Sequence, residues 1–165
     1  LDFGAGAGRH CLLLKSMGFE VTAADYSENA IVQINSLNEN FRTTKIHSFP
    51  FDFEDEEFDL IVCWGVLHYN EIEDAKKIVT ELKRILKIGG TFTGTIRSTT
   101  DTHLKEKNSA IQLEDLKDGR IFLYSLEDVK NLLSDFPIAE FGYSERTPMG
   151  KLDERICHWI FKTKK

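Results

Sequence analysis

The feature that most constrains this chain is its opening run, L-D-F-G-A-G-A-G-R-H, in which three alternating glycines separate two apolar segments. Residues 1–3 are typical of the end of a buried strand, and residues 11–17 continue as a helix with an apolar side. Glycine has no Cβ, so the backbone can turn sharply there and a ligand can approach it closely. A helix start also offers unpaired N–H groups. The order of strand, glycine loop and helix therefore predicts a ligand site in an α/β sheet.

The spacing of the glycines indicates which ligand this loop would hold. A dinucleotide fingerprint requires G-x-G-x-x-G or G-x-G-x-x-A, but Arg9 occupies the position of the third small residue. The run from Asp2 to Gly8 instead resembles D-x-G-x-G-x-G, motif I of the class I S-adenosylmethionine-dependent methyltransferases. The resemblance implies that the loop holds the methionine part of that cofactor.

An acidic residue follows the loop at the distance expected for a ribose contact. Residues 19–25, F-E-V-T-A-A-D, are typical of a short strand that ends in Asp25, about 20 residues beyond the loop. A carboxylate accepts hydrogen bonds from both hydroxyls of a cis-diol, which favours ribose binding. The alternative is that Asp25 caps a helix beginning near Ser27, although Ser27 is itself the better N-cap. The resemblance further implies that Tyr26 packs beside the adenine.

Later motifs extend the resemblance to about Arg97. An apolar strand, F-D-L-I-V-C-W-G, precedes V-L-H-Y, which is similar to the family's L-H-H, and L-K-I-G-G resembles its L-K-P-G-G turn. The family implies a doubly wound, Rossmann-like three-layer α/β sandwich. Its mostly parallel seven-stranded sheet has the order 3-2-1-4-5-7-6 and an antiparallel C-terminal hairpin. We expect one methyltransferase domain over residues 1–165, with its N-terminal part missing because the chain opens inside a strand.

The hydrophobic pattern places the remaining elements. Helices are predicted at residues 27–40, at 74–86, and from Ser125, where S-x-x-D with Asp128 approximates a capping box. Strands are predicted at residues 44–49, 60–65, 91–96, 138–145 and 155–163. Gly89 and Gly90 are expected to end the second of these helices and to turn the chain into a strand. The polar segment 98–124 is either part of a lid, as in the family, or a surface insertion.

The resemblance assigns the cofactor site largely to residues at strand ends. The family often has an acid near the adenine amino group, but His47 stands at that place, so Ser48 and backbone groups are expected to serve there. Asp2 is expected to attract the cofactor's ammonium group. Trp64 would wall the adenine or the acceptor, with a core position as the alternative. The predicted contacts to S-adenosyl-L-methionine, which leaves as S-adenosyl-L-homocysteine, come from Asp2, Gly4, Ala5, Gly6, Asp25, Tyr26, Ser48, Phe49, Cys63 and Trp64.

Methyl transfer needs no protein nucleophile, but an acceptor that must lose a proton needs a base. His68, just beyond the predicted strand 60–65, is the catalytic candidate; the alternative is a structural histidine bonded to the next loop. His10, His103 and Tyr124 are weaker candidates, and His158 is expected to be structural. No metal site is expected.

Composition narrows the partners of the chain. A net charge of −6 and a pI near 5.4 argue against a nucleic-acid binder, and no apolar run approaches the length of a membrane span. Cys11, Cys63 and Cys157 lack metal-like spacing, which favours buried free thiols in a reducing compartment. We therefore expect a cytoplasmic protein that acts on a small-molecule acceptor.

Two other functions are compatible with the same motifs. An NAD(P)-dependent oxidoreductase would share the fold and Asp25, but the glycine spacing and the lack of an evident Tyr-x-x-x-Lys disfavour it. A methyltransferase-like subunit that binds the cofactor without turning it over would carry every motif named above.

Overall fold

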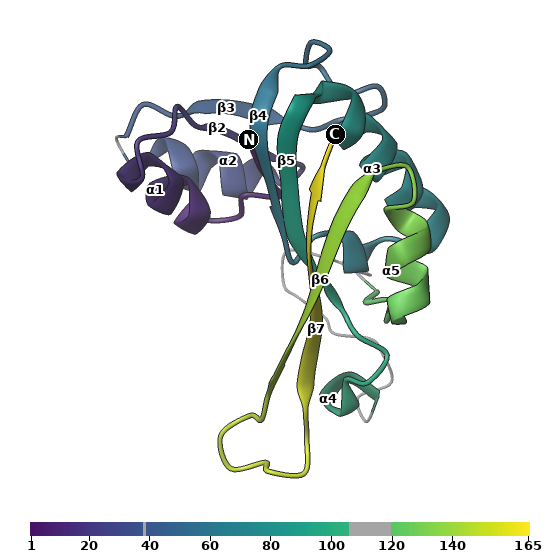
Figure 1. Ribbon diagram of the computed structural model, residues 1–165. Helices are drawn as coiled ribbons and strands as arrows, with labels where there is room; N and C mark the ends of the chain where they lie inside the picture. The colour runs from purple at the N-terminus through teal and green to yellow at the C-terminus, as the bar shows by residue number, and fades with distance from the viewer. Residues whose placement is uncertain (38, 106–119) are drawn as a thin grey trace.

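The protein is built around one sheet with the strand order β3-β2-β1-β4-β5-β7-β6 (Figure 1). The computed structural model describes residues 1–37, 39–105 and 120–165. The strands are β1 (Asp2–Phe3), β2 (Thr22–Asp25), β3 (Arg42–Lys45), β4 (Phe58–Trp64), β5 (Leu86–Arg97), β6 (Ile138–Arg146) and β7 (Ile156–Lys164). The predicted Rossmann-like architecture and strand order are confirmed.

The pairing of the strands fixes where a ligand can bind. β1 pairs in parallel with both β2 and β4, so the carboxyl ends of these three strands meet at one edge of the sheet. In open α/β sheets this edge, at the point where the strand order reverses, is the usual ligand crevice. β7 runs antiparallel to both β5 and β6, as predicted for the closing hairpin. Figure 1 shows that the far half of this hairpin projects beyond the other strands.

Helices cover both faces of the sheet. They are α1 (Arg9–Ser16), α2 (Glu28–Asn35), α3 (Ile72–Ile85), α4 (Thr102–Lys105) and α5 (Leu126–Leu132), with a 3₁₀ turn η1 at Leu67–Tyr69. Figure 1 shows α1 and α2 on the β2–β3 side and α3 beside α5. Successive residues of β4 point to opposite faces. Ile61 joins the core that contains α3 and α5, and Val62 joins the smaller core that contains α1 and α2. The almost wholly apolar β4 sequence is explained by this double burial.

Several element boundaries differ from the predicted ones. α2 ends at Asn35 rather than at residue 40, and Asn40 has a φ of 52°, which no right-handed helix contains. α3 ends at Ile85, before the two glycines, because Leu86 is already extended and pairs with Phe58. Gly89, with a φ of 77°, instead turns the chain within the range of β5.

The capping box that begins α5 is confirmed. The Ser125 hydroxyl accepts from the Asp128 amide, and the Asp128 carboxylate accepts from the Ser125 amide. Each of the two side chains therefore satisfies an amide at the helix start that has no partner within the helix.

Membrane spans, metal-binding groups and the cysteines were also compared with the sequence-based expectations. Within the described ranges, no helix is long and apolar enough to cross a membrane, and no group of side chains could hold a metal ion. The three cysteines are free and buried, as predicted. Of the predicted lid or insertion at 98–124, residues 106–119 lie outside the described residues. At its ends lie α4 and a parallel bridge between Ser98 and Tyr124.

Candidate functional site

The glycine loop after β1 is a left-handed turn that favours glycine at three positions. Gly4, Gly6 and Gly8 have φ values of 75°, 53° and 83°, and Gly8 caps α1. A Cβ on Gly4 would lie 2.2 Å from Cγ2 of Val66, whereas a Cβ on Gly6 would meet nothing within 4 Å. Gly4 is therefore required for packing, and Gly6 keeps the space beside the loop open.

The backbone donors of this loop are already used inside the protein. The amides of Gly4 and Ala5 both donate to the Ala24 carbonyl, at 2.7 and 3.1 Å. The Gly6 amide donates to Oδ2 of Asp25 at 2.9 Å. These three amides are therefore not free donors for a ligand.

Asp25 joins the end of β2 to the glycine loop. Its Oδ2 accepts from Gly6, and its Oδ1 accepts from the Ser27 amide at 2.9 Å. Ser27 is the N-cap of α2, with its hydroxyl accepting from the Ala30 amide. The carboxylate therefore supports the start of α2, as the capping alternative held, while it also contacts the loop. Each carboxylate oxygen can accept a further hydrogen bond.

Asp2 places a buried carboxylate beneath the loop. The side chain is fully buried, and Oδ2 accepts from Sγ of Cys11 at 3.2 Å. Oδ1 has no hydrogen-bond partner among the described residues, and Nδ1 of His10 lies 4.0 Å away. Burial raises the pKa of Asp2 above its usual value. The hydrogen bond from Cys11 and the nearby His10 act in the opposite direction, but their effect is smaller. A buried carboxylate oxygen without a partner fits an ammonium group, such as that of the cofactor implied by the resemblance.

Exposed aromatic side chains mark the same edge of the sheet. Trp64, at the end of β4, is 42% exposed, and its ring centroid lies 5.8 Å from that of His10. The core alternative for Trp64 is therefore wrong. Tyr26 and Phe49 are also exposed, and Phe49 stacks on Phe51 at 5.1 Å. These faces are available to pack against a flat ring such as adenine.

The other two predicted contacts differ in exposure. Ser48 is exposed in the loop that follows β3, because that strand ends at Lys45 rather than at residue 49. Cys63 is completely buried in the core that contains α3, and burial raises the pKa of its thiol. The Cys63 side chain therefore faces away from solvent, and only its backbone is left to face a ligand.

His68 lies in η1, directly beyond β4. The residue is 4% exposed, and its Nδ1 has no hydrogen-bond partner in the described part of the chain. Burial, and then the nearby Arg97 and His158, lower its pKa to about 3. The imidazole is therefore neutral at physiological pH. The main chain of His68 also joins two distant segments, since the Phe122 amide donates to the His68 carbonyl at 2.8 Å.

The weaker candidates fall into two groups. Nδ1 of His103 pairs with Glu154, and the Tyr124 hydroxyl donates to the Asn70 carbonyl at 2.8 Å, so both have partners within the protein. His158, which is expected to be structural, lies beside Arg97 and close to His68. Arg97 was not predicted as a site residue; its position at the carboxyl end of a parallel strand is the signal that could have found it.

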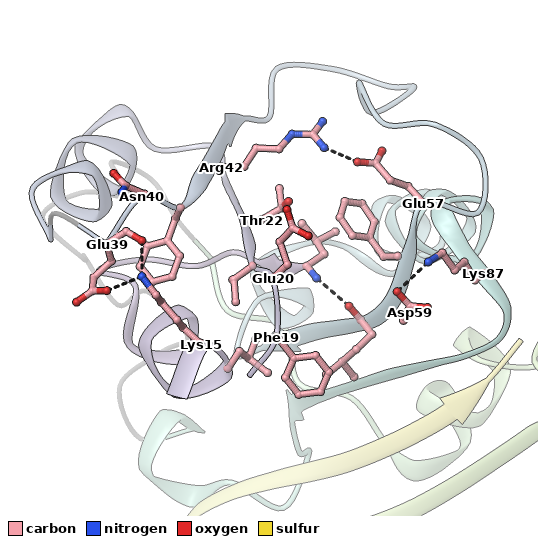
Figure 2. Close-up of a pocket in the computed structure, with 16 residues that line it drawn as sticks. Lys15, Phe19, Glu20, Thr22, Glu39, Asn40, Arg42, Glu57, Asp59 and Lys87 are labelled. Atoms are coloured by element: carbon pink, nitrogen blue, oxygen red, sulfur yellow. Dashed lines mark hydrogen bonds and ion pairs between the residues drawn. The ribbon is translucent and has the colours of Figure 1, made fainter. Parts of the chain in front are cut away.

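A groove with a volume of about 580 Å³ lies at the opposite edge of the sheet (Figure 2). It surrounds Leu1 between β2 and β4 and contains none of the predicted site residues. Its charged rim is internally paired, through Lys15–Glu39, Arg42–Glu57 and Lys87–Asp59. Because the ligand edge of an α/β sheet is the carboxyl edge, this groove is not the candidate site.

Comparison with known proteins agrees with this geometry. The family described as "Methyltransferase domain" matches residues 1–93. A probable S-adenosyl-L-methionine-dependent methyltransferase TehB of Haemophilus influenzae is 31% identical over 94 residues, which are 54% of this chain and 32% of that protein. A demethylmenaquinone methyltransferase of Clavibacter sepedonicus is 33% identical over 94 residues, 54% of this chain and 37% of that protein. The chain thus spans about a third of the length of such relatives.

The fold has a match among solved structures over nearly its whole length. The crystal structure of a SAM-dependent methyltransferase from Methanosarcina mazei superposes with a TM-score of 0.77 and 20% identity, covering 99% of this chain and 90% of that one. At this level of identity the likeness is one of fold.

Proposed function

Because this chain belongs to the S-adenosylmethionine-dependent methyltransferases, we propose that it transfers a methyl group from S-adenosyl-L-methionine to a small-molecule acceptor. The demethylmenaquinone methyltransferase among its relatives supports an acceptor of this size. Because the chain belongs to this family, we reject the alternative of an NAD(P)-dependent oxidoreductase. The observation that carries the cofactor assignment is the buried, unpartnered Oδ1 of Asp2 beneath the glycine loop.

The chemistry is an in-line displacement. When bound, S-adenosyl-L-methionine would supply a methyl group on a sulfonium: the acceptor would provide the electron pair of the new bond to carbon, and the electron pair of the broken S–CH₃ bond would remain on the departing sulfur. The protein contributes position and electrostatics to such a reaction. No protein nucleophile is required.

Each side of the site then has a distinct role. Asp2 would pair with the ammonium group, and Asp25 would accept from the ribose hydroxyls with its remaining lone pairs. Gly6 would admit the ligand because nothing fills the space where its side chain would be. Tyr26 and Trp64 would pack against the adenine or the acceptor.

His68 is the proposed base for an acceptor that loses a proton. It lies beyond β4 and is neutral at physiological pH, so its ring can accept a hydrogen bond from the acceptor; with a pKa of about 3, the buried ring is a weak proton acceptor in the unliganded protein. Its unpartnered Nδ1 is free to bond an acceptor. The net charge of −6 supports a partner other than nucleic acid, and three free thiols support a cytoplasmic location.

Titration calorimetry with S-adenosyl-L-homocysteine tests the cofactor assignment, with NADH in a parallel titration. We expect binding of the former and a loss of about tenfold or more in Asp2→Asn. Preferential NADH binding, or unchanged affinity in a folded Asp2→Asn protein, would overturn the assignment. Turnover of the labelled cofactor against metabolite fractions separates an enzyme from a cofactor-binding subunit.

A further inference from the structure

A second group of polar side chains lies beyond the ends of β4 and β5. It contains His68, Arg97 and His158, which come from η1, β5 and β7. Nη1 of Arg97 donates to Nε2 of His158 at 3.1 Å, and the two imidazole centroids lie 6.2 Å apart. Cε1 of His68 lies 3.8 Å from the position of a Cβ on Gly65, the residue after Trp64. This group, which we call the Arg97 cluster, thus adjoins the candidate cofactor site.

Arg97 is held in place by a buried carboxylate. Its side chain is 12% exposed, and its Nε lies 2.9 Å from Oδ2 of Asp101. Despite this distance, the Nε–H makes no hydrogen bond within the described residues, because the N–H does not point at that oxygen. The Asp101 carboxylate is itself fixed by the amides of Leu104 and Cys157, which donate to Oδ1 and Oδ2 at 2.9 Å each. A guanidinium carries five N–H donors, and those of Arg97 that face neither Asp101 nor His158 are the candidates to bind a ligand.

The unsatisfied polar atoms of this protein are not scattered. Among the described residues, the buried side-chain nitrogens and oxygens without a hydrogen bond are Oδ1 of Asp2, Nδ1 of His68 and Nε of Arg97. Arg97 ends β5, His68 follows β4, and Asp2 lies in β1 one residue before the strand ends. Buried polar groups in folded proteins are nearly always paired, so a site for two ligands explains all three exceptions. Asp2 faces the cofactor side, and the other two atoms belong to the Arg97 cluster.

Cationic side chains act on both imidazoles of the cluster. Arg97 lowers the pKa of both His68 and His158 in addition to the effect of burial. Arg146 acts in the same direction on His158, and Asp101 acts against it. Both imidazoles are therefore neutral. In His158, Nε2 accepts from Arg97, so the ring proton is on Nδ1 and can be donated.

From this arrangement we propose that the Arg97 cluster binds an anionic oxygen group, a carboxylate or a phosphate, carried by the methyl acceptor. The planar fork of a guanidinium matches two oxygens of either group, and neutral imidazoles beside it can add further hydrogen bonds. The proposal rests on the proposed function, because it takes the second ligand of the site to be the acceptor. It narrows the acceptor to anionic molecules.

NMR of the protein saturated with S-adenosyl-L-homocysteine tests this directly. Acetate, inorganic phosphate and the neutral analogue acetamide are titrated separately, and the Arg97 Nε–H and His68 imidazole signals are followed. We expect one or both anions to shift these signals saturably and acetamide to leave them unchanged. A response to acetate alone assigns a carboxylate, and a response to phosphate alone assigns a phosphate. Shifts with acetamide, or none with either anion, would overturn the proposal.

Variants separate a binding role from a structural one. Arg97→Gln should weaken anion affinity about tenfold, whereas Arg97→Lys keeps the charge beside Asp101 but loses the fork and should give an intermediate loss. Arg42→Gln makes the same change at an exposed ion pair on the other side of the sheet and should leave anion affinity unaltered. Unchanged affinity in both folded Arg97 variants would refute the proposal. If the wild type fails to bind S-adenosyl-L-homocysteine yet responds to anions, the proposed function fails and the anion site stands.

Discussion

The Asp25 carboxylate accepts a hydrogen bond from the Gly6 amide at 2.9 Å, which ties the acid at the end of β2 to the glycine loop at the end of β1. The two features were predicted to contact different parts of one cofactor molecule. They are also partners of each other, so the shape of the loop and the position of the carboxylate depend on the same bond. A substitution at either residue must therefore be judged by cofactor affinity and by stability together.

Asp25→Ala should weaken binding of S-adenosyl-L-homocysteine by about 1–3 kcal/mol, the scale of hydrogen bonds to a charged group. It should also lower the free energy of unfolding, because the amides of Gly6 and Ser27 lose their acceptor. Calorimetry and urea unfolding measure the two effects. The matched control is Ser27→Ala, which removes the α2 cap for about 1 kcal/mol of stability and should leave cofactor affinity unchanged. Equal affinity of Asp25→Ala and wild type would refute the ribose role.

Gly4→Ala and Gly6→Ala should affect different properties although the two glycines lie two residues apart: the first stability, the second chiefly cofactor affinity. At Gly4 the new methyl group would overlap Val66, so the loss is one of stability, about 1–3 kcal/mol from overpacking, with added strain from its φ of 75°. At Gly6 the methyl group enters open space, so the protein should fold at a cost of about 1–2 kcal/mol and lose cofactor affinity.

The same two measurements, unfolding and cofactor calorimetry, test this pair. Val66→Ala in the Gly4→Ala background should restore part of the stability, since it removes the overlapping methyl groups. Normal cofactor uptake by Gly6→Ala would show that the loop is not the ligand contact.

The order of the helices and strands could be predicted from patterns of residues close together in the sequence. The same patterns predicted many of the residues at the ligand-binding edge of the sheet. Alternating glycines, an acid ending the next strand and the Ser125–Asp128 box each depend on residues close in the chain, and the structure has all three. The start of β5 at Leu86 could not be foreseen in this way, because it depends on pairing with Phe58, 28 residues earlier.

The Arg97 cluster could not be predicted for the same reason, because its residues come from distant parts of the sequence. His68 was predicted from its place after β4, but the two neighbours that add to the effect of burial on its pKa, Arg97 and His158, come from β5 and from the antiparallel β7. His158 reads in the sequence as one residue of an imperfectly alternating strand. Only the register that sets Arg97 opposite His158 brings the two side chains together.

Arg84 should be worth more to stability than most surface arginines. Its guanidinium donates to the carbonyls of Phe51 and Phe53, at 3.0 and 2.9 Å, and also pairs with Glu81 and Asp55. Arg84→Ala would leave these carbonyls without their donor, and we expect a loss of about 1–3 kcal/mol in urea unfolding. Arg42→Ala breaks an exposed pair and should cost at most about 1 kcal/mol. Equal losses in the two variants would contradict the assigned role of Arg84, which is to hold the loop that contains Phe51, Phe53 and Asp55.

His68 should make the stability of the protein depend on pH below neutrality. Its pKa is lowered from 6.5 to about 3 in the folded chain, chiefly by burial. Between these pH values the unfolded chain binds a proton that the folded chain does not, so the free energy of unfolding falls as the pH falls. For one proton the limiting slope is about 1.4 kcal/mol per pH unit. This stability is complete above pH 6.5 and is lost progressively toward pH 3.

Urea unfolding of wild type and His68→Asn at several pH values between 7.5 and 5 isolates this contribution. His158 has a lowered pKa as well, so the wild-type slope contains both histidines, and only the difference between the two proteins reports on His68. We expect that difference to shrink steadily as the pH falls below 6.5, because the variant lacks the buried imidazole. His47→Asn, which replaces an exposed imidazole, serves as the control and should follow the wild-type curve. Parallel curves for wild type and His68→Asn would mean that the folded protein accommodates a charged His68, and its assignment as a neutral base would then be untenable.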